Sequence, residues 1–249
     1  MNKYSDKEYK IFSRLFILKE FSEKNLEKLA STHIGIVGMG GVGCPLSLYL
    51  VNSGIKKLTL VDGDFIEESN LNRQILFDRD DLGKKKVEVA KKKLEKINSN
   101  CVINIKDKHL NQKNIFSLSN CSIIVDATDD WKTSKFLNSY CLENSINFLF
   151  SSVIRHDLQI ILFNNNKKEH LCLNCIFPNE NEVDLPRCET VGISGISAGL
   201  AGLISAQKII NFTLNLRDET NILTISDGKK LSIDNIIIKS KHDCYLNTV

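Results

Sequence analysis

A short apolar segment followed at once by a glycine-rich turn decides the fold of this chain: His33-Ile34-Gly35-Ile36-Val37-Gly38-Met39-Gly40-Gly41-Val42-Gly43. The first five residues have the composition of a buried strand, and a helical pattern begins directly after the last glycine. The turn matches G-x-G-x-x-G, in which backbone amides and a helix N-terminus face phosphate oxygens. A Cβ would hold the phosphate away from the backbone. The candidate nucleotide-binding residues of the turn are Gly38, Gly40, Gly41 and Gly43.

Strand and helix patterns continue to alternate along the chain. Strands are predicted at His33–Val37, Leu58–Val61, Val102–Ile105, Ile123–Val125 and Asn147–Phe150, with helices near 44–53, 84–98 and 133–144. Such a series gives a parallel sheet covered on both faces. Later, Gly192–Phe212 predicts an apolar helix, and two strands, at Asn221–Ile225 and Leu231–Lys239, are joined by a turn at Ser226–Lys230. We expect an α/β, Rossmann-like fold with a mostly parallel central sheet and a C-terminal antiparallel extension.

The expected organisation is one domain over residues 1–249. Two of the three prolines, Pro178 and Pro186, belong to the polar stretch around Asn179–Arg187, which predicts a loop. The expected parts are an N-terminal helical segment (1–30), a nucleotide-binding part (31–177), a crossover loop (178–191), and a helix with strands that bind a partner (192–249).

The charge balance argues against a polyanion partner. There are 33 basic and 30 acidic residues, a formal net charge of +3, so nucleic acid is not expected. Residues 1–10 are polar and begin no signal or membrane-spanning segment, which predicts no membrane association and a cytoplasmic location. In that compartment the eight cysteines are expected as thiols, metal ligands or catalytic groups rather than disulfides.

The residues after the second strand are more specific than the glycine turn. Asp62 ends that strand, at the position that binds ribose hydroxyls, and together with the turn it suits any nucleotide binder, NAD included. The stretch reads Asp62-Gly63-Asp64-Phe65-Ile66-Glu67-Glu68-Ser69-Asn70-Leu71-Asn72-Arg73-Gln74. Gly83–Val87 and Asp126–Asp130 follow in order.

In this order of motifs the chain resembles the MoeB/ThiF/HesA family of ubiquitin-activating-like adenylyltransferases, with spacing closest to its bacterial MoeB branch. The resemblance covers nearly the whole chain. It implies ATP-dependent adenylylation of the C-terminal Gly carboxylate of a ubiquitin-like sulfur carrier (MoaD-like, ending in Gly-Gly), with release of pyrophosphate. Four alternatives stay open: activation of a ThiS-like carrier for thiamin thiazole synthesis, activation of another carboxylate such as one on modified tRNA, a NAD-dependent oxidoreductase, and a non-catalytic carrier-binding scaffold.

The resemblance also implies residue roles. Lys86 and Arg73 contact the phosphates, Asn70 helps to hold them, and Asp62 binds the ribose. The remaining candidates for binding the nucleotide within the same motif are Asp64, Ser69, Leu71 and Asn72. Arg14, in the N-terminal helix, reaches the neighbouring subunit's site, which implies a homodimer.

The resemblance assigns Mg²⁺ to Asp129 or Asp130. The family has asparagine where this chain has Asp130, and an added negative charge beside a polyphosphate is repulsive without metal. Two interpretations follow: Asp130 also faces Mg²⁺, or its side chain points away.

Several cysteines are candidate functional residues. Cys172 and Cys175 have the C-x-x-C spacing of two zinc ligands, and the family completes the site with a C-terminal C-x-x-C. Here only Cys244 remains of that pair, because Asn247 replaces its last cysteine. Either His242 completes a Cys₃His zinc site, or the metal is lost and the thiols are buried as small hydrophobes.

Cys188, in the crossover loop, is a candidate nucleophile toward the activated carrier, with a bystander as the alternative. The other cysteines are expected to pack in the interior: Cys44, Cys101, Cys121 and Cys141. Since no rhodanese-like extension follows residue 249, we expect a separate sulfurtransferase.

Overall fold

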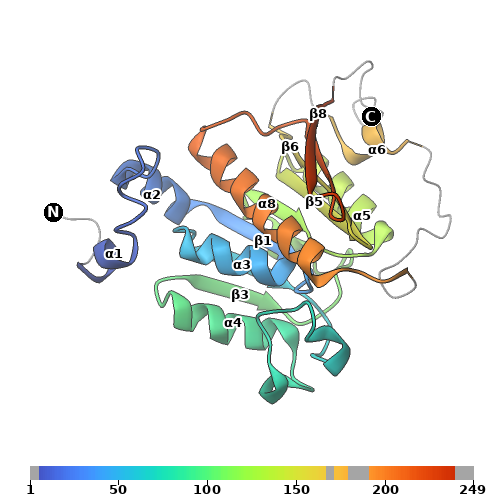
Figure 1. Ribbon diagram of the computed structural model, residues 1–249, viewed down its shortest axis with the longest axis horizontal. Helices are drawn as coiled ribbons and strands as arrows, with labels where there is room; N and C mark the ends of the chain where they lie inside the picture. Colours follow the sequence, from blue (N-terminus) through green and yellow to red (C-terminus); the bar gives the residue numbers. More distant parts are fainter. Residues whose placement is uncertain (1–5, 167–170, 179–190, 239–249) are drawn as a thin grey trace.

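The computed structural model describes residues 6–166, 171–178 and 191–238. Within them, one sheet of eight strands has the order β3-β2-β1-β4-β5-β6-β7-β8 (Figure 1). The strands span His33–Val37 (β1), Lys57–Val61 (β2), Val102–Lys106 (β3), Ile123–Asp126 (β4), Asn147–Ile154 (β5), Asp157–Phe163 (β6), Ile222–Asp227 (β7) and Ser232–Ile237 (β8). β1 to β5 pair in parallel, whereas β6, β7 and β8 are added antiparallel. The predicted Rossmann-like sheet with its antiparallel extension is confirmed.

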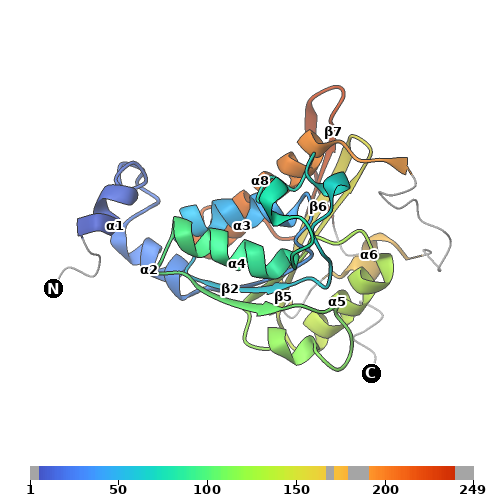
Figure 2. The same cartoon turned by 90° about the horizontal axis from the view of Figure 1, so that it is seen from below.

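Helices cover both faces of the sheet (Figure 2). α3 (Gly43–Asn52), α4 (Lys86–Ile97) and α8 (Gly195–Leu214) lie on one face, and α5 (Trp131–Glu143) lies on the other. The side chains of a strand alternate between the two faces. Ile34 and Ile36 of β1 accordingly pack in the cluster beneath α3, α4 and α8, while Val37 packs in the cluster beneath α5. Two apolar layers therefore hold the carboxyl ends of β1 and β4 in fixed positions.

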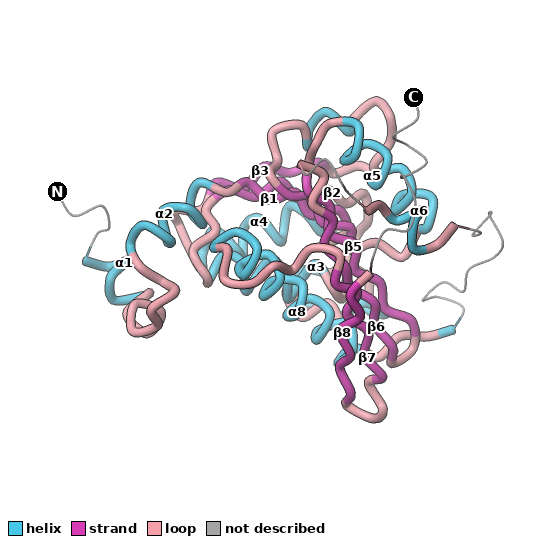
Figure 3. Tube along the Cα trace, turned by 90° about the horizontal axis from the view of Figure 1, so that it is seen from above, coloured by secondary structure: helices cyan, strands magenta, loops and turns pink. Residues whose placement is uncertain are grey.

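The shorter elements lie around this core. They are α1 (Asp6–Ile11), α2 (Glu23–Ser31), α6 (Leu173–Ile176), and the 3₁₀ turns η1 (Glu68–Asn70), η2 (Arg79–Asp81) and η3 (Ile115–Leu118). α1 and α2 lie at the end of the molecule opposite the antiparallel strands (Figure 3). None of the described helices is both long enough and apolar enough to cross a membrane.

The largest difference from expectation is strand β6, which the sequence patterns leave unassigned. β5 is also longer than expected, because it continues past Ser151 and Ser152 to Ile154. Those serines interrupt the apolar run, and the turn into β6 uses Arg155 at φ 56°, a residue type that gives no turn signal. The division of residues 1–249 into parts stays a prediction, and most of the expected crossover loop lies outside the described residues.

Candidate nucleotide-binding cleft

A cleft of about 960 Å³ opens where the strand order reverses between β1 and β4. In open parallel sheets, crossover helices leave in opposite directions at such a point and a crevice forms beyond the carboxyl ends of the strands. Segments that follow β1, β2, β3 and β4 all line this cleft, and residues of β5 and β6 close it. Its size is that of a small-molecule site.

The glycine turn after β1 forms the floor of the cleft. Gly38 has φ 94°, and a Cβ there would lie 2.6 Å from the carbonyl oxygen of Ala127 after β4. A Cβ on Gly43 would lie 2.0 Å from the carbonyl oxygen of Gly38. At Gly40 the nearest atom would be 3.9 Å away, so that side of the turn is open to the cleft. Two glycines thus shape the turn, and a third leaves room for a ligand to approach the backbone.

Helix α3 begins directly after this turn. Its N-cap is Val42, which supplies no side-chain hydrogen bond, and its first turn holds no acidic residue. The amides at the start of a helix carry partial positive charge and lack partners within the helix. The floor of the cleft is therefore suited to an anion such as a phosphate group.

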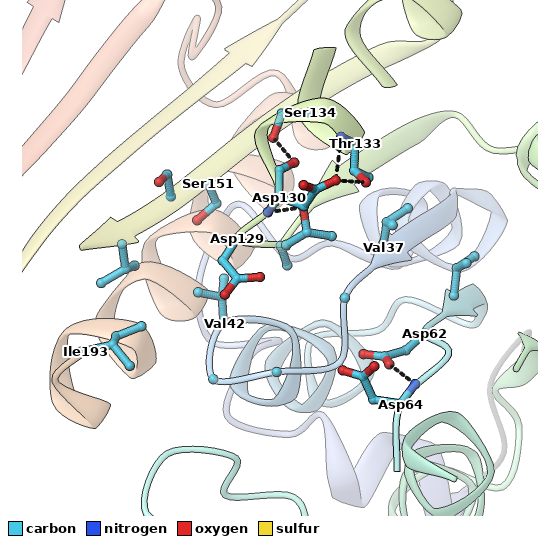
Figure 4. A pocket seen from close by; sticks show the side chains of 18 of the residues that line it. Val37, Val42, Asp62, Asp64, Asp129, Asp130, Thr133, Ser134, Ser151 and Ile193 are labelled. Carbon is cyan, nitrogen blue, oxygen red and sulfur yellow. Dashed lines mark hydrogen bonds between the residues drawn. The ribbon is translucent and has the colours of Figure 1, made fainter. Parts of the chain in front are cut away.

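Asp62 joins the end of β2 to the glycine turn. Its Oδ2 accepts a hydrogen bond from the Met39 amide (2.7 Å), and its Oδ1 accepts one from the Asp64 amide (2.8 Å; Figure 4). A carboxylate has about four lone-pair positions, so both oxygens keep capacity for further donors such as ribose hydroxyls. The two backbone bonds fix its orientation at the cleft wall.

Lys86 is the first residue of α4 and places a buried cation at the cleft. Its side chain is 7% exposed, and Nζ lies 2.8 Å from Oδ2 of Asp64, whose side chain is 50% exposed. The Lys86 amide also donates to the Asp64 carbonyl oxygen (3.1 Å). Both residues line the cleft, so the cation of Lys86 is held beside it by a carboxylate that is itself half open to solvent.

Arg73 adds a second cation from the segment around η1. Its Nη1 donates to the Ser69 carbonyl oxygen (2.7 Å) and to Oδ1 of Asn72 (3.1 Å). Among the described carboxylates, none forms an ion pair with Arg73. Its positive charge is therefore oriented by neutral acceptors and remains available to a ligand.

The other residues of the segment around η1 differ in whether they line the cleft. Asn70 is buried, lines the cleft, and accepts a hydrogen bond at Oδ1 from the Glu67 amide (3.3 Å). Ser69, Leu71 and Asn72 were expected at the nucleotide, but they do not line the cleft. Ser69 and Asn72 instead orient Arg73, and Leu71 packs against the core.

Two consecutive carboxylates after β4 differ in their surroundings. Asp130 caps α5: its Oδ2 accepts from the amide (2.9 Å) and the hydroxyl (2.7 Å) of Thr133. Asp129 is exposed, lines the cleft, and has no hydrogen-bond or ion-pair partner among the described residues. Figure 4 shows the Asp130 carboxylate turned toward Thr133, whereas that of Asp129 points away from it. The cap occupies one carboxylate oxygen of Asp130, and Asp130 also lines the cleft.

Three buried polar atoms around the cleft lack a partner among the described residues: Oε1 of Gln74, Nε1 of Trp131 and Oγ of Ser151. Burying such atoms without a hydrogen bond is costly, which makes them candidates for ligand contacts. None was predicted. Gln74 closes the motif that begins at Asp62, whereas Ser151 lies within an apolar strand and Trp131 opens a helix, where the sequence gives no signal.

The cysteine pair lies at α6, beside the cleft residue Phe177. Sγ of Cys172 and Sγ of Cys175 are 3.7 Å apart. Two thiolates bound tetrahedrally to one Zn²⁺ at about 2.3 Å each would be about 3.8 Å apart, so the pair fits the metal. The other proposed ligands, Cys244 and His242, lie outside the described residues, as does Cys188. Within the described residues, no group of three or more candidate ligands occurs.

The four cysteines expected to pack are all buried: Cys44, Cys101, Cys121 and Cys141. Burial raises the pKa of the Cys44, Cys101 and Cys121 thiols to about 12, and that of Cys141 also rises well above its usual range. These thiols are therefore neutral. Arg14 is exposed and does not line the cleft of its own chain; it lies in the turns that follow α1 rather than in the helix expected from the sequence.

The family model described as the ThiF family matches residues 12–246. A "Probable molybdopterin-synthase adenylyltransferase" of Porphyra purpurea is 32% identical over 236 residues, covering 91% of this chain and 61% of that protein. The "Sulfur carrier protein ThiS adenylyltransferase" of Escherichia coli K12 is 25% identical over 241 residues, covering 96% and 95%. An "Adenylyltransferase and sulfurtransferase MOCS3" of Drosophila persimilis is 31% identical over 239 residues, covering 94% and 52%. The chain thus spans between half and about three fifths of several relatives.

Solved structures agree on the fold. The crystal structure of E. coli MccB with ATP superimposes with a TM-score of 0.82 at 22% identity, covering 96% of this chain and 75% of that one. MccB with AMPCPP and selenomethionine-substituted MccA gives the same TM-score at 21% identity, covering 97% and 74%. At these identities the likeness concerns the arrangement of the chain alone.

Proposed function

Because the chain belongs to the ThiF family, we propose that it uses ATP to adenylylate the C-terminal carboxylate of a small ubiquitin-like protein. The observation that supports this most strongly is the meeting of four features in one cleft: the glycine turn, Asp62, two cations and the open carboxylate of Asp129. In the reaction, a carboxylate oxygen bonds to the α-phosphorus of ATP while the bond to the β-phosphate oxygen breaks. Pyrophosphate leaves with the electron pair.

The side chains of the cleft suit this chemistry. The attacking carboxylate is already an anion near neutral pH, so no general base is required. Negative charge accumulates on the phosphate oxygens, and fixed cations stabilise it when they are oriented beforehand. Lys86 and Arg73 are such cations, because one is held by Asp64 and the other by the Ser69 carbonyl oxygen. Asp62 would hold the ribose.

We propose Mg²⁺ as the cofactor, with Asp129 as the residue that holds it. A carboxylate oxygen is the kind of ligand that Mg²⁺ prefers. Asp129 and Asp130 both line the cleft, and Asp129 is the more exposed of the two. When bound, the ion would neutralise charge on the phosphates. Asp130 was the other candidate; its contacts to Thr133 favour a structural role.

The proposed substrate is a sulfur carrier with a Gly-Gly end. The relative named for molybdopterin synthase shares 32% identity and the one named for ThiS shares 25%. A MoaD-like carrier is therefore our first choice, and a ThiS-like carrier the alternative. An oxidoreductase would leave Lys86 and Arg73 unexplained. A non-catalytic scaffold would be favoured if the extra charge of Asp130 repelled the phosphates, but the cap of α5 accommodates that charge.

Further partners complete the proposal. We propose a homodimer in which Arg14 reaches the neighbouring cleft, a separate sulfurtransferase that converts the acyl-adenylate, and zinc held by Cys172, Cys175, Cys244 and His242. A nucleophilic role for Cys188 and a cytoplasmic location remain predictions as well.

The decisive experiment offers purified carriers of both kinds to the chain with ATP and Mg²⁺. Mass spectrometry of the carrier should find an adenylylated C-terminus, and ATP–pyrophosphate exchange should depend on the carrier. Absence of both products with either carrier, in a preparation that binds ATP, would exclude this substrate class. Hydride transfer followed at the nicotinamide absorbance tests the oxidoreductase alternative directly.

A further inference from the structure

We propose that Asp126 and Asp130 are positioning residues, which together fix the turn between β4 and α5 so that the carboxylate of Asp129 faces a ligand. This inference rests on the proposed function, because Asp129 matters as the ligand of Mg²⁺ and ATP. It assigns a role to Asp126, which the sequence motif includes without a role, and a different role to Asp130.

Asp126 anchors the first half of the turn. It is the last residue of β4, pairs in register with Val37 on one side and Phe150 on the other, and is completely buried. Its Oδ1 accepts from the amide (3.0 Å) and the hydroxyl (2.7 Å) of Thr128. Because both neighbouring strands hold its backbone, these two bonds fix Thr128 relative to the centre of the sheet.

Asp130 anchors the second half. Its Oδ2 accepts twice from Thr133, and the Ser134 hydroxyl donates to its carbonyl oxygen (3.2 Å). The Asp130 amide in turn lies 3.5 Å from the Thr128 hydroxyl oxygen, which links the two halves. Asparagine also has an acceptor oxygen for the amides of a helix N-terminus, so Asp130→Asn should keep the cap.

The turn is also packed against the floor of the cleft. A Cβ on Gly38 would lie 2.6 Å from the Ala127 carbonyl oxygen and 3.1 Å from the Thr128 amide nitrogen. The backbone on both sides of Asp129 is thus held by hydrogen bonds, and the segment beneath it by close packing. Asp129 itself has an exposed side chain.

The three carboxylates of this turn also differ in the groups that stabilise their negative charge. Asp126 is buried, and Oδ2 has no partner among the described residues. Asp130 sits at the positive end of α5 with two donors on one oxygen, where its charge is stabilised. Asp129 has neither stabilising contact. Of three aspartates within five residues, it is the one whose negative charge a bound cation would neutralise.

The test compares Asp130→Ala with Asp130→Asn, and uses Asp78→Ala as a matched control. Asp78 also caps a short helix, η2, through a hydrogen bond from the Asp80 amide (3.0 Å), but it does not line the cleft. We expect Asp130→Ala to lower the rate of ATP–pyrophosphate exchange at saturating ATP about tenfold. The exchange rates of Asp130→Asn and Asp78→Ala should stay near that of the wild type.

A second arm examines whether Asp130 acts through Asp129. In an Asp129→Asn background, Asp130→Ala should lower exchange no further, because the residue it positions is already lost. Equal effects in both backgrounds would overturn the proposal, as would equal damage from Asp130→Asn and Asp130→Ala. Asp126→Asn, which keeps the acceptor for Thr128, should behave as Asp130→Asn does.

A third arm needs no carrier. The ratio of ATP affinities with and without Mg²⁺ should fall in Asp129→Asn and in Asp130→Ala but not in Asp78→Ala, with thermal unfolding recorded for each variant. If the wild type shows this Mg²⁺ dependence but no carrier reacts, the proposed substrate is wrong. The ATP affinities of the variants then still test whether Asp130 positions Asp129. If wild type shows no Mg²⁺ dependence, the inference on Asp129 and its supports fails.

Discussion

Nζ of Lys86 lies 2.8 Å from Oδ2 of Asp64, and the two side chains differ sharply in exposure, 7% against 50%. A buried cation is costly unless it is paired, so Asp64 compensates the charge of Lys86 at the cleft wall in the absence of a ligand. An arriving polyphosphate can then share or replace this partner. The same pairing explains why the motif contains a second aspartate two residues after Asp62.

Replacing Lys86 with alanine should lower the rate of ATP–pyrophosphate exchange about 100-fold or more, which is the scale of losing one fixed electrostatic donor. The control is Lys92→Ala, an exposed position on the same helix that does not line the cleft. Steady-state exchange rates at saturating ATP provide the measurement. Near-normal turnover in Lys86→Ala would remove this residue from the phosphate site.

Alanine substitutions at the glycines of the turn should differ in their effect on stability, because different atoms surround each position. Gly43→Ala places a Cβ against the Gly38 carbonyl oxygen, and such overpacking costs about 1–3 kcal/mol of unfolding free energy or more. Gly40→Ala has space for its methyl group, so it should keep the wild-type stability while weakening ATP binding about tenfold through loss of the close backbone approach.

The control for both glycine variants is Gly83→Ala, at φ 76° with no atom within 4 Å of the added carbon. It should lose only about 1 kcal/mol from left-handed backbone strain. Urea unfolding and ATP titration of the three variants check this order. Equal destabilisation of all three would contradict it.

Metal analysis of the purified chain should find about one zinc per chain, since the 3.7 Å Sγ to Sγ distance of Cys172 and Cys175 suits two thiolates on one ion. Cys172→Ser should lose the metal and Cys101→Ser, a buried thiol elsewhere, should keep it. A zinc content near zero in protein purified without chelators would leave the pair as packed thiols.

Stability should depend on the protonation of Asp126. Burial raises the pKa of its carboxyl to about 6, although the nearby Ser134 hydroxyl and the hydrogen bonds from Thr128 lower it and the charge of Asp130 raises it further. The folded state holds this proton more tightly than the unfolded state, whose pKa is near 3.8, so the contribution of Asp126 to stability is fully present below about pH 3.8. It is lost as pH rises through about 6, by about 1.4 kcal/mol for each unit of difference in pKa.

Asp126→Asn cannot lose that proton, so its unfolding free energy should increase relative to wild type between about pH 4 and pH 7. Denaturant unfolding across this range gives the difference directly. Asp157→Asn, at an exposed position, measures the general effect of removing one carboxylate. A constant offset between Asp126→Asn and wild type would show that the buried carboxyl does not titrate there.

Substitution of Arg14 tests the proposed homodimer. If it reaches the neighbouring cleft, mixing Arg14→Ala subunits with Lys86→Ala subunits should restore part of the exchange activity, because one of the two clefts in each mixed dimer then receives both wild-type side chains. Verified mixed dimers without activity would exclude this arrangement.

The parallel part of the fold could be predicted because each strand there is a short run of apolar residues between helical patterns. β6 could not be predicted, because Ser151 and Ser152 interrupt the apolar run of the strand before it. The turn between the two strands uses Arg155, a residue type that does not indicate a turn. Similarly, Lys86 and Asp62 follow from an ordered motif and do line the cleft. The contacts of Ser69 and Asn72 to Arg73 depend on how the segment around η1 folds back, which no linear pattern records.

The start of α4 at Lys86 sets a limit on how this sequence can evolve. In the native register Gly83 and Lys84 bond to the backbone of Ile66, and the Lys86 amide bonds to that of Asp64. Adding or removing one residue between Gly83 and Lys85 would break this register, so the amine of Lys86 would no longer be held opposite Asp64. Most surface connections accept insertions and deletions freely, but we expect this one to tolerate neither.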